Sequence, residues 1–289
     1  MTIGDEVIVT ILDGKMVANK LKEKIKTSIA GLENKPGLAV ICIGDDPASK
    51  LYVKLKHKIC QELGIYVEEY CFENDVTEEA ILTLIDELNA SEKIHGILLQ
   101  SPVPYHLNIL NLFNRISPEK DIDGFNPINV GRLAQGQDAF VPCTPLGVIH
   151  VLEEYGVEIE GKNCVVIGRS NIVGRPMAQL LINRNGTVTI CHSKTNDLAS
   201  ITKEADILIV AVGKPGFITG DMIKDGAVIV DVGINRIEAS KKISGDVDFE
   251  SVKDKCAFIT PVPGGVGPMT IITLMENLLK AYNNIMGND

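Results

Sequence analysis

Two side chains capable of proton transfer, Tyr52 and Lys56, stand four residues apart in the segment SKLYVKLK. On a helix, residues with this spacing share one face, so a phenol and an amine would lie side by side. Such a pair can position a water molecule or a carbonyl group and move a proton. A tyrosine and a lysine on a solvated helix face would show the same pattern, so the spacing leaves both interpretations open.

Three further segments carry residues that could hold a ligand. Gln100 ends an apolar run, and α/β sheets place ligand contacts at such strand ends. Asp123 lies in the acidic turn KDIDG, where a carboxylate could bind paired N–H groups of a heterocycle. Gly264 and Gly265, in PVPGGVGP, would let the backbone approach a ligand closely. Each segment is also compatible with an ordinary turn or loop.

The turn GRSNIVGRP follows an apolar run and precedes a helical pattern, as the dinucleotide fingerprint G-x-G-x-x-G does. Gly168 takes the first position, Ser170 replaces the second glycine, and Gly174 comes one residue late. N–H groups at the helix start would face a phosphate, although a glycine-rich turn without a ligand remains the alternative. The next strand ends without an acid for a ribose 2′-hydroxyl, whereas Arg169 and Ser193 suit a 2′-phosphate, so NADP is favoured over NAD.

Short apolar runs alternate with amphipathic runs, which predicts an α/β fold. The predicted strands span residues 38–44, 66–72, 95–100, 163–168, 187–192, 206–212 and 227–233, and the predicted helices span residues 49–63, 77–89, 146–155, 174–184 and 269–286. The strands of the second half are apolar on both faces, which is typical of a parallel sheet covered by helices. Residues 117–145, rich in Pro, Gly, Asn and Asp, predict a functional loop or a domain junction.

Composition narrows the function classes. The chain has 289 residues, enough for two domains, and a net charge of −10, which argues against a nucleic-acid partner. No apolar run approaches the roughly 20 residues that cross a bilayer, and no secretory signal is recognisable. Seven cysteines without a C-x-x-C spacing are typical of reduced thiols, so we expect a cytoplasmic protein with no membrane partner. Five histidines without H-x-x-x-H spacing give no support for a metal site.

Together the motifs resemble the bifunctional methylenetetrahydrofolate dehydrogenase/methenyltetrahydrofolate cyclohydrolase family. The resemblance runs in order along nearly the whole chain, through ILDGK, YVKLK, QSPVP, KDIDGF, PCTP, GRSNIVGRP, AVGKPG, DVGIN and ITPVPGGVGPMT. One departure is Ser101, where the family usually has leucine, and the smaller side chain would fill the space less well.

The resemblance implies NADP-dependent oxidation of 5,10-methylenetetrahydrofolate, followed by hydrolysis of the 5,10-methenyl product to 10-formyltetrahydrofolate in the same site. It implies two α/β domains flanking a cleft, the second a Rossmann-like doubly wound parallel sheet. We expect residues 1–145 plus 269–289 to form the folate-binding catalytic domain and residues 146–268 the NADP-binding domain. Members of the family are commonly homodimers, so we expect one here.

The resemblance also assigns site residues. The expected catalytic residues are Lys56, Tyr52, Gln100 and Asp123, with Lys56 moving the proton, Gln100 tuning it and Asp123 holding the pterin ring. The expected folate contacts are Tyr52, Gln100, Asp123, Pro263, Gly264 and Gly265. The expected cofactor contacts are Gly168, Arg169, Ser170, Ser193 and Ile234.

Two other functions remain open at this stage. An NADP-dependent dehydrogenase of a small amino or hydroxy acid would share the second half of the chain, but it would not need the Asp123 turn. A noncatalytic NADP-binding protein would keep the fold but lose nothing measurable when Lys56 is replaced.

Overall fold

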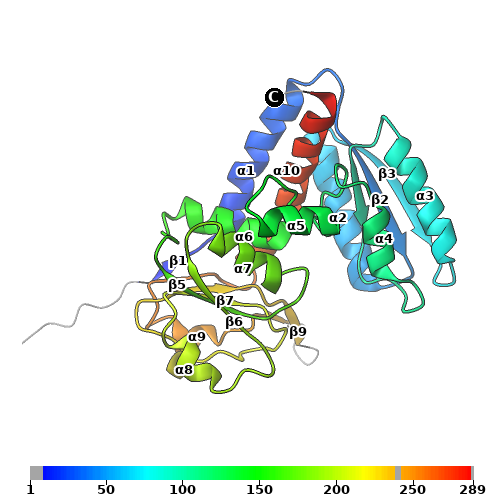
Figure 1. Cartoon of the computed structure of the whole chain (residues 1–289). Coiled ribbons are helices and arrows are strands. Elements are labelled where there is room, and N and C mark those ends of the chain that lie inside the picture. Colours follow the sequence, from blue (N-terminus) through cyan, green and yellow to red (C-terminus); the bar gives the residue numbers. More distant parts are fainter. Residues whose placement is uncertain (1–8, 238–241, 288–289) are drawn as a thin grey trace, which may run out of the picture. The chain divides into compact units, whose positions relative to one another are not determined.

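The structure, a computed structural model, describes residues 9–237 and 242–287, with only the backbone described for residues 47–52. The chain divides into two compact units (Figure 1). The first, here the six-stranded unit, comprises Met1–Asn19 and Thr144–Thr270, and the second, here the three-stranded unit, comprises Lys20–Cys143 and Ile271–Asp289.

The three-stranded unit is built on a parallel sheet with strand order β3-β2-β4. Its strands are β2 (Gly37–Ile43), β3 (Tyr66–Phe72) and β4 (Gly96–Leu99). Its helices are α2 (Pro47–Leu63), α3 (Glu78–Ala90), α4 (Ile109–Arg115) and α5 (Pro127–Ala134). The long helices α1 (Gly14–Ala30) and α10 (Val266–Met286) lie mostly in this unit.

Side chains of β2 point alternately to the two faces of the sheet, and each face packs against different helices. Ala39, Ile41 and Ile43 point to one face, where they pack against apolar residues of α3 and α4. Successive side chains of a strand point to opposite faces, so Cys42 points to the other face. On that side Cys60 of α2 contacts Met275 of α10, with 3.6 Å between the two sulfur atoms.

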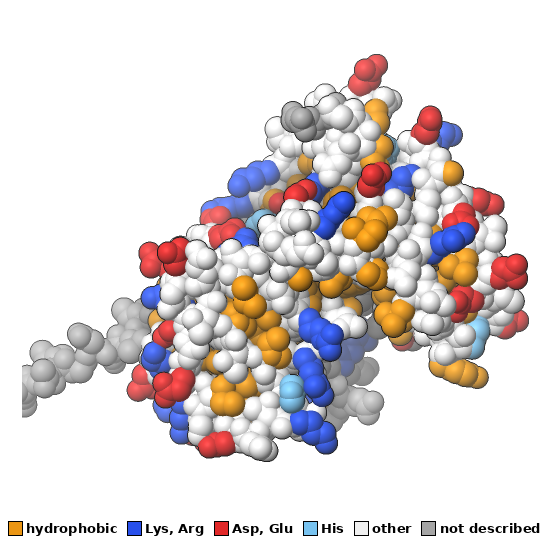
Figure 2. Space-filling view, viewed as in Figure 1, with side chains coloured by type: hydrophobic (Ala, Val, Ile, Leu, Met, Phe, Trp, Pro, Cys, Tyr) orange, Lys and Arg blue, Asp and Glu red, His pale blue; other side chains and the backbone are white. Residues whose placement is uncertain are grey.

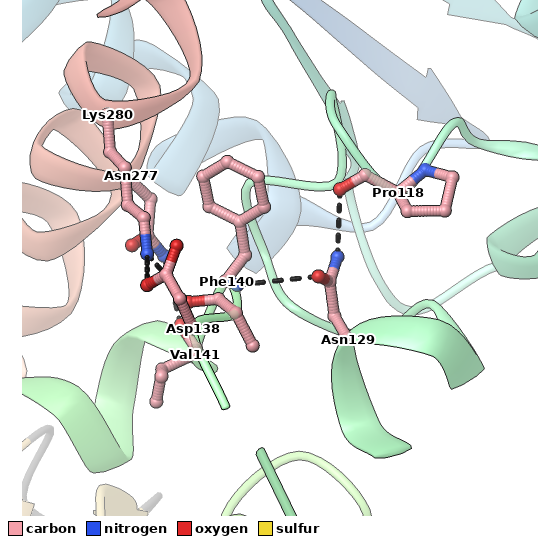
Figure 3. A network of polar contacts seen from close by, with 8 residues as sticks. Pro118, Asn129, Asp138, Phe140, Val141, Asn277 and Lys280 are labelled. Atoms are coloured by element: carbon pink, nitrogen blue, oxygen red, sulfur yellow. Dashed lines mark hydrogen bonds and ion pairs between the residues drawn. The ribbon is translucent and has the colours of Figure 1, made fainter. Parts of the chain in front are cut away.

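Asparagine and lysine side chains tie the segment after β4 to the rest of this unit (Figure 3). Asn129 donates a 2.9 Å hydrogen bond to the Pro118 carbonyl and accepts one from the Phe140 N–H. Lys280 of α10 pairs with Asp138 (Figure 3). The segment is therefore held in place by side-chain hydrogen bonds and an ion pair.

The six-stranded unit is a parallel sheet with strand order β1-β11-β8-β7-β5-β6. Its strands are β1 (Thr10–Ile11), β5 (Asn163–Ile167), β6 (Thr187–Cys191), β7 (Ile207–Val210), β8 (Val228–Asp231) and β11 (Phe258–Ile259). β5 lies between β6 and β7 in the sheet. The chain passes from β5 to β6 on one side of β5 and then crosses to β7 on the other side of β5. This reversal is the switch point at which doubly wound sheets bind ligands.

Helices and a small hairpin complete the six-stranded unit. They are α6 (Cys143–Glu154), α7 (Gly174–Ile182), α8 (Leu198–Thr202), α9 (Phe249–Val252), the 3₁₀ helix η1 (Gly220–Met222), and the antiparallel strands β9 (Asn235–Ile237) and β10 (Lys242–Ser244). The strands β5, β7 and β8 are buried nearly throughout, as their apolar sequences predict. The same prediction is wrong for β6, which is largely exposed because it lies at the edge of the sheet.

The predicted α/β class and the doubly wound parallel sheet are confirmed. Residues 117–145, predicted to be a functional loop or a domain junction, contain the boundary between the two units, which falls between Cys143 and Thr144. They also contain α5 and the start of α6, which the sequence did not predict. Asn126 caps α5 by accepting from the Ile128 N–H, and Pro127 occupies its first turn. Residues 9–19 group with the six-stranded unit, where β1 pairs with β11.

Across the face shown in Figure 2, acidic side chains are scattered with basic ones among them, in keeping with the net charge of −10. Among the helices within residues 9–237 and 242–287, none has the length and apolarity needed to span a membrane.

Candidate active site

Lys56 and Gln100, 44 residues apart in sequence, meet in the three-stranded unit. The half-buried Lys56 Nζ on α2 donates a 3.0 Å hydrogen bond to Gln100 Oε1. Gln100 is held at two further points, because its backbone N–H donates to the Ile41 carbonyl at 2.9 Å and its Nε2 donates to the Ser101 carbonyl at 2.7 Å. The second bond fixes which end of the amide faces the lysine, so the acceptor oxygen is presented to Nζ.

Asp123 lies in the same unit, and Lys56 is close enough to influence its charge. Burial raises the pKa of the Asp123 carboxyl, while the Lys56 ammonium and a hydrogen bond from the Cys143 thiol oppose this rise. The Cys143 Sγ lies 3.7 Å from Asp123 Oδ1. The three predicted residues Lys56, Gln100 and Asp123 thus belong to one electrostatic group, with the lysine interacting with the other two.

Neighbouring residues fix the turn that carries Asp123. The buried Lys120 Nζ donates to the carbonyls of Leu88, Asn89 and Ser91 at 2.7–3.0 Å, which satisfies acceptors at the end of α3. On the other side of the turn, Asn277 Nδ2 donates to the Ile122 carbonyl at 2.7 Å. Lys120 and Ile122, which precede Asp123 in the turn, are therefore both anchored by hydrogen bonds.

Tyr52 belongs to α2, four residues before Lys56, as the sequence predicts. Its side chain lies outside the described part of the structure. The shared helix face stays a prediction.

The glycine turn after β5 has the geometry of a phosphate cradle. Gly168 has φ +128°, and a Cβ at this position would lie 2.4 Å from the Ala211 carbonyl oxygen. Ser170 Oγ accepts hydrogen bonds from the Val173 and Gly174 N–H groups at the start of α7. Arg169 and Ser170 are exposed, as is Ser193 beyond the end of β6. The structure therefore places these four predicted cofactor contacts at the carboxyl ends of two adjacent strands, β5 and β6.

The remaining predicted contacts also lie in the six-stranded unit. Ile234 is 49 % exposed after β8, and the PGG segment precedes α10. A Cβ on Gly265 would lie 2.6 Å from the Pro261 carbonyl oxygen, so only glycine fits there. Pro263 and Gly264 are at least partly accessible to solvent.

One residue of this unit was missed by sequence reasoning. Asp246 is fully buried and its carboxylate accepts four hydrogen bonds of 2.6–2.9 Å, from the N–H groups of residues 212, 213 and 214 and from Asn235 Nδ2. It therefore holds the loop after β7. Its sequence context, SGDVD, looks like an ordinary turn, so no local signal distinguishes it.

No metal centre is found among the described residues, where three or more His, Cys, Asp or Glu side chains never gather closely enough to hold an ion.

A doubly wound parallel sheet with a glycine cradle at its switch point, together with a lysine–glutamine pair near a partly buried carboxyl, defines a nicotinamide-dependent dehydrogenase of two α/β units. The chain belongs to the tetrahydrofolate dehydrogenase/cyclohydrolase family. The catalytic-domain model of that family matches residues 12–123, and its NAD(P)-binding-domain model matches residues 142–286.

Individual relatives agree with this assignment. The bifunctional protein FolD of Campylobacter hominis is 54% identical over 277 residues, covering 95% of this chain and 97% of that protein. The structure of the bifunctional FolD methylenetetrahydrofolate dehydrogenase/cyclohydrolase from Campylobacter jejuni is 49% identical with a TM-score of 0.94, over 96% of this chain and 99% of that one. The Trypanosoma brucei FolD structure, complexed with NADP cofactor and inhibitor, is 38% identical with a TM-score of 0.92, over 96% and 98% of the two chains.

A more distant likeness concerns the small-acid alternative. Shikimate 5-dehydrogenase from Thermus thermophilus is 14% identical with a TM-score of 0.52, over 87% of this chain and 94% of that one. At this identity the likeness shows a shared fold alone, so it gives no support to a small-acid substrate.

Proposed function

We propose that one site, built on Lys56, Gln100 and Asp123, serves both reactions of this family in the present chain. The chain oxidises 5,10-methylenetetrahydrofolate with NADP and hydrolyses the 5,10-methenyl product to 10-formyltetrahydrofolate. The observation that carries the proposal is the 3.0 Å hydrogen bond between Lys56 Nζ and Gln100 Oε1, with the partly buried Asp123 carboxyl close enough to interact with Lys56.

The oxidation requires placement more than proton transfer. The methylene carbon lies between two nitrogen atoms, so the cation left by hydride loss is stabilised by both lone pairs. The site therefore has to hold the pterin still and exclude competing orientations. We assign this task to Asp123, whose carboxyl can pair with adjacent N–H groups of the heterocycle.

The hydrolysis requires a proton to move. Water adds to the methenyl carbon, loses a proton, and a ring nitrogen must gain one before it leaves. Lys56 is the group that can accept and return this proton, since its Nζ is only half-buried and is oriented by Gln100. Tyr52, one helical turn away on α2, is proposed to lie over the folate beside the lysine.

The cradle in the six-stranded unit fits NADP. The close approach of Gly168 to Ala211 leaves no room for a Cβ, so the backbone of this turn can come close to a pyrophosphate. Arg169, Ser170 and Ser193 are exposed there, so they would bind the dinucleotide, with Arg169 at the 2′-phosphate. When bound, NADP supplies the hydride acceptor for the oxidation.

Further parts of the proposal rest on the sequence. We assign folate binding to residues 1–145 plus 269–289 and NADP binding to residues 146–268, with Pro263, Gly264 and Gly265 lining the folate site and Ile234 contacting the cofactor. A homodimer and a cytoplasmic location are proposed from the family resemblance and from the cysteine pattern.

The test is a spectroscopic time course with methylenetetrahydrofolate, run with NADP and with NAD on the wild-type chain and on Lys56→Ala. For the wild type we expect nicotinamide reduction with NADP and no accumulation of methenyl absorbance. For Lys56→Ala we expect reduction to continue while hydrolysis falls by about 10²- to 10⁴-fold, so that methenyl absorbance builds up.

Lys58→Ala is the matched control, because Lys58 lies on the same helix but is exposed and faces Glu62. It should behave as the wild type does. Hydrolysis retained in Lys56→Ala, with the circular dichroism spectrum unchanged, would refute the role given to Lys56. No reduction with either cofactor would return the small-acid dehydrogenase and the noncatalytic protein to consideration.

A further inference from the structure

Two cysteines outside the proposed machinery face each other across adjacent strands. Cys42 of β2 and Cys71 of β3 are paired in register in the parallel sheet. Residues paired in this way point to the same face, and neighbouring strands lie about 4.8 Å apart. That spacing falls within the Cα separations of about 4.4–6.8 Å that a disulfide can bridge. Because β3 is an edge strand, it can adjust without disturbing a further neighbour.

The surroundings of the pair make it accessible. Cys71 is exposed and Cys42 is partly exposed, whereas each of the other five cysteines is buried. Both Cys42 and Cys71 line a cavity of about 360 Å³, which is also lined by Lys54, Glu69 and Gln100. A small oxidant can therefore reach this thiol pair from solvent. Gln100, which orients Lys56, lines the same cavity.

We propose that Cys42 and Cys71 form a redox modification site, at which a hydroperoxide converts the two thiols to a cross-strand disulfide. The Cys71 sulfur attacks the peroxide, the O–O bond breaks, the thiol proton goes to the leaving oxygen, and a sulfenic acid and one water are formed. The Cys42 sulfur then attacks the Cys71 sulfur, the S–O bond breaks, and the Cys42 thiol proton passes to the leaving hydroxyl, which departs as a second water. In sum, two thiols and one hydrogen peroxide give one disulfide and two waters.

The order of the two steps follows from exposure and charge. Burial and the neighbouring Cys71 raise the pKa of the Cys42 thiol to about 11, which keeps it protonated. Cys71 is the exposed member, so it meets the oxidant first. Cys42 then completes the disulfide, because it stands directly opposite in the sheet.

The disulfide acts on the proposed site through β2. Cys42 directly follows Ile41, whose carbonyl accepts the 2.9 Å hydrogen bond from the Gln100 N–H. The disulfide ties β2, and with it the Ile41 carbonyl that anchors Gln100, to the edge strand β3, so an adjustment of β3 is passed on to the amide that orients Lys56. This consequence rests on the proposed function. We expect oxidation to lower hydrolysis by about tenfold or more, with a smaller loss of nicotinamide reduction, since only the hydrolysis needs proton transfer by Lys56.

The experiment treats the full-length chain with hydrogen peroxide, blocks free thiols with N-ethylmaleimide and maps the disulfides by mass spectrometry. Digestion must cut after Glu62 as well as after lysine, because trypsin alone leaves Cys60 and Cys71 on one peptide, residues 59–93. Wild type is compared with Cys71→Ser and with Cys42→Ser, and each is assayed before and after oxidation. Cys71→Ser alters an exposed position, so it tests the proposal even where Cys42→Ser does not fold.

We expect the wild type to lose two of its seven titratable thiols, to yield a linked Cys42–Cys71 peptide and to recover with dithiothreitol. Cys71→Ser should give no linked peptide and keep its own pre-oxidation ratio of hydrolysis to reduction. The redox site would be refuted if N-ethylmaleimide still alkylated both Cys42 and Cys71 after peroxide treatment. It would also be refuted if both cysteines were oxidised but no peptide linked them. An equal loss of hydrolysis in Cys71→Ser would overturn the effect on Gln100.

The peptide mapping needs no folate activity. A reduced wild type that fails to hydrolyse methenyltetrahydrofolate would therefore count against the proposed function, while the linked peptide would still decide the redox site.

Discussion

At the scale of single residues, cofactor choice depends on Arg169. It is exposed beside the cradle after β5, and β6 is followed by His192, Ser193 and Lys194, with no acid directly at its end to bind a ribose 2′-hydroxyl. Arg169→Ala should raise the Michaelis constant for NADP about 10- to 100-fold and leave that for NAD nearly unchanged, since a hydrogen bond to a charged group contributes about 1.5–3 kcal/mol. Steady-state kinetics with both cofactors measures this.

Arg184→Ala is the control for that experiment. Arg184 follows the carboxyl end of α7 and pairs with Glu153 at 2.9 Å, so it lies at the opposite end of the helix from the cradle. An equal rise for NADP and NAD in Arg169→Ala would show that Arg169 does not bind the 2′-phosphate.

At the scale of elements, Asp246 determines the shape of the loop after β7. Each of its two carboxylate oxygens accepts two hydrogen bonds, so replacing Asp246 with Asn removes one acceptor oxygen and the two bonds that it accepts, and places an NH₂ group against N–H donors. We expect Asp246→Asn to lower the free energy of unfolding by about 2–4 kcal/mol. Urea denaturation measures the loss, and NADP titration shows whether the loop supports the cofactor.

Asp248→Asn is a closely matched control. Asp248 caps α9 by accepting from the Ser251 N–H, and asparagine caps a helix about as well as aspartate. This variant should therefore keep the stability of the wild type. If Asp246→Asn unfolded at the same urea concentration as the wild type, Asp246 would not be what holds the loop after β7.

At the scale of the whole molecule, buried carboxyls make stability depend on pH. Burial raises the pKa of Asp121 to about 7 and that of Asp231 to about 6. Both carboxyls accept hydrogen bonds from N–H groups, which lower the pKa, but the effect of burial is larger. Between an unfolded pKa of about 4 and these folded values, the folded chain binds more protons than the unfolded chain. The free energy of unfolding should therefore fall as the pH rises from about 4 to about 6.

His95 contributes with the opposite sign. Burial lowers its pKa, so the unfolded chain binds its proton more tightly, and this contribution to stability increases as the pH rises through about 6.5. Carbon-13 NMR of the aspartate side chains separates the groups. Two carboxyls should titrate near pH 6 and pH 7, and carboxyls that are all ionised at pH 5 would contradict the assignment.

The elements of this chain were largely predictable because their signals are local. Strand β3 spans Tyr66–Phe72 as predicted, and α7 begins at Gly174 as predicted. Two-residue strands such as β1 and β11 escaped notice, since a pair of residues has no periodicity to read. Helix α5 was overlooked because its proline and asparagine, which suggest a loop, serve as its first turn and its cap.

By itself, the sequence determined the α/β class, the family and the positions of Lys56, Gln100, Asp123 and the Gly168 turn. Each of these depends on residue types within a short window. Only the tertiary structure decided that Gln100 turns its oxygen to Lys56, that Asp246 clamps a loop more than thirty residues away, and that Cys42 stands opposite Cys71. Strand register and burial arise from contacts between distant segments, so no local pattern encodes them.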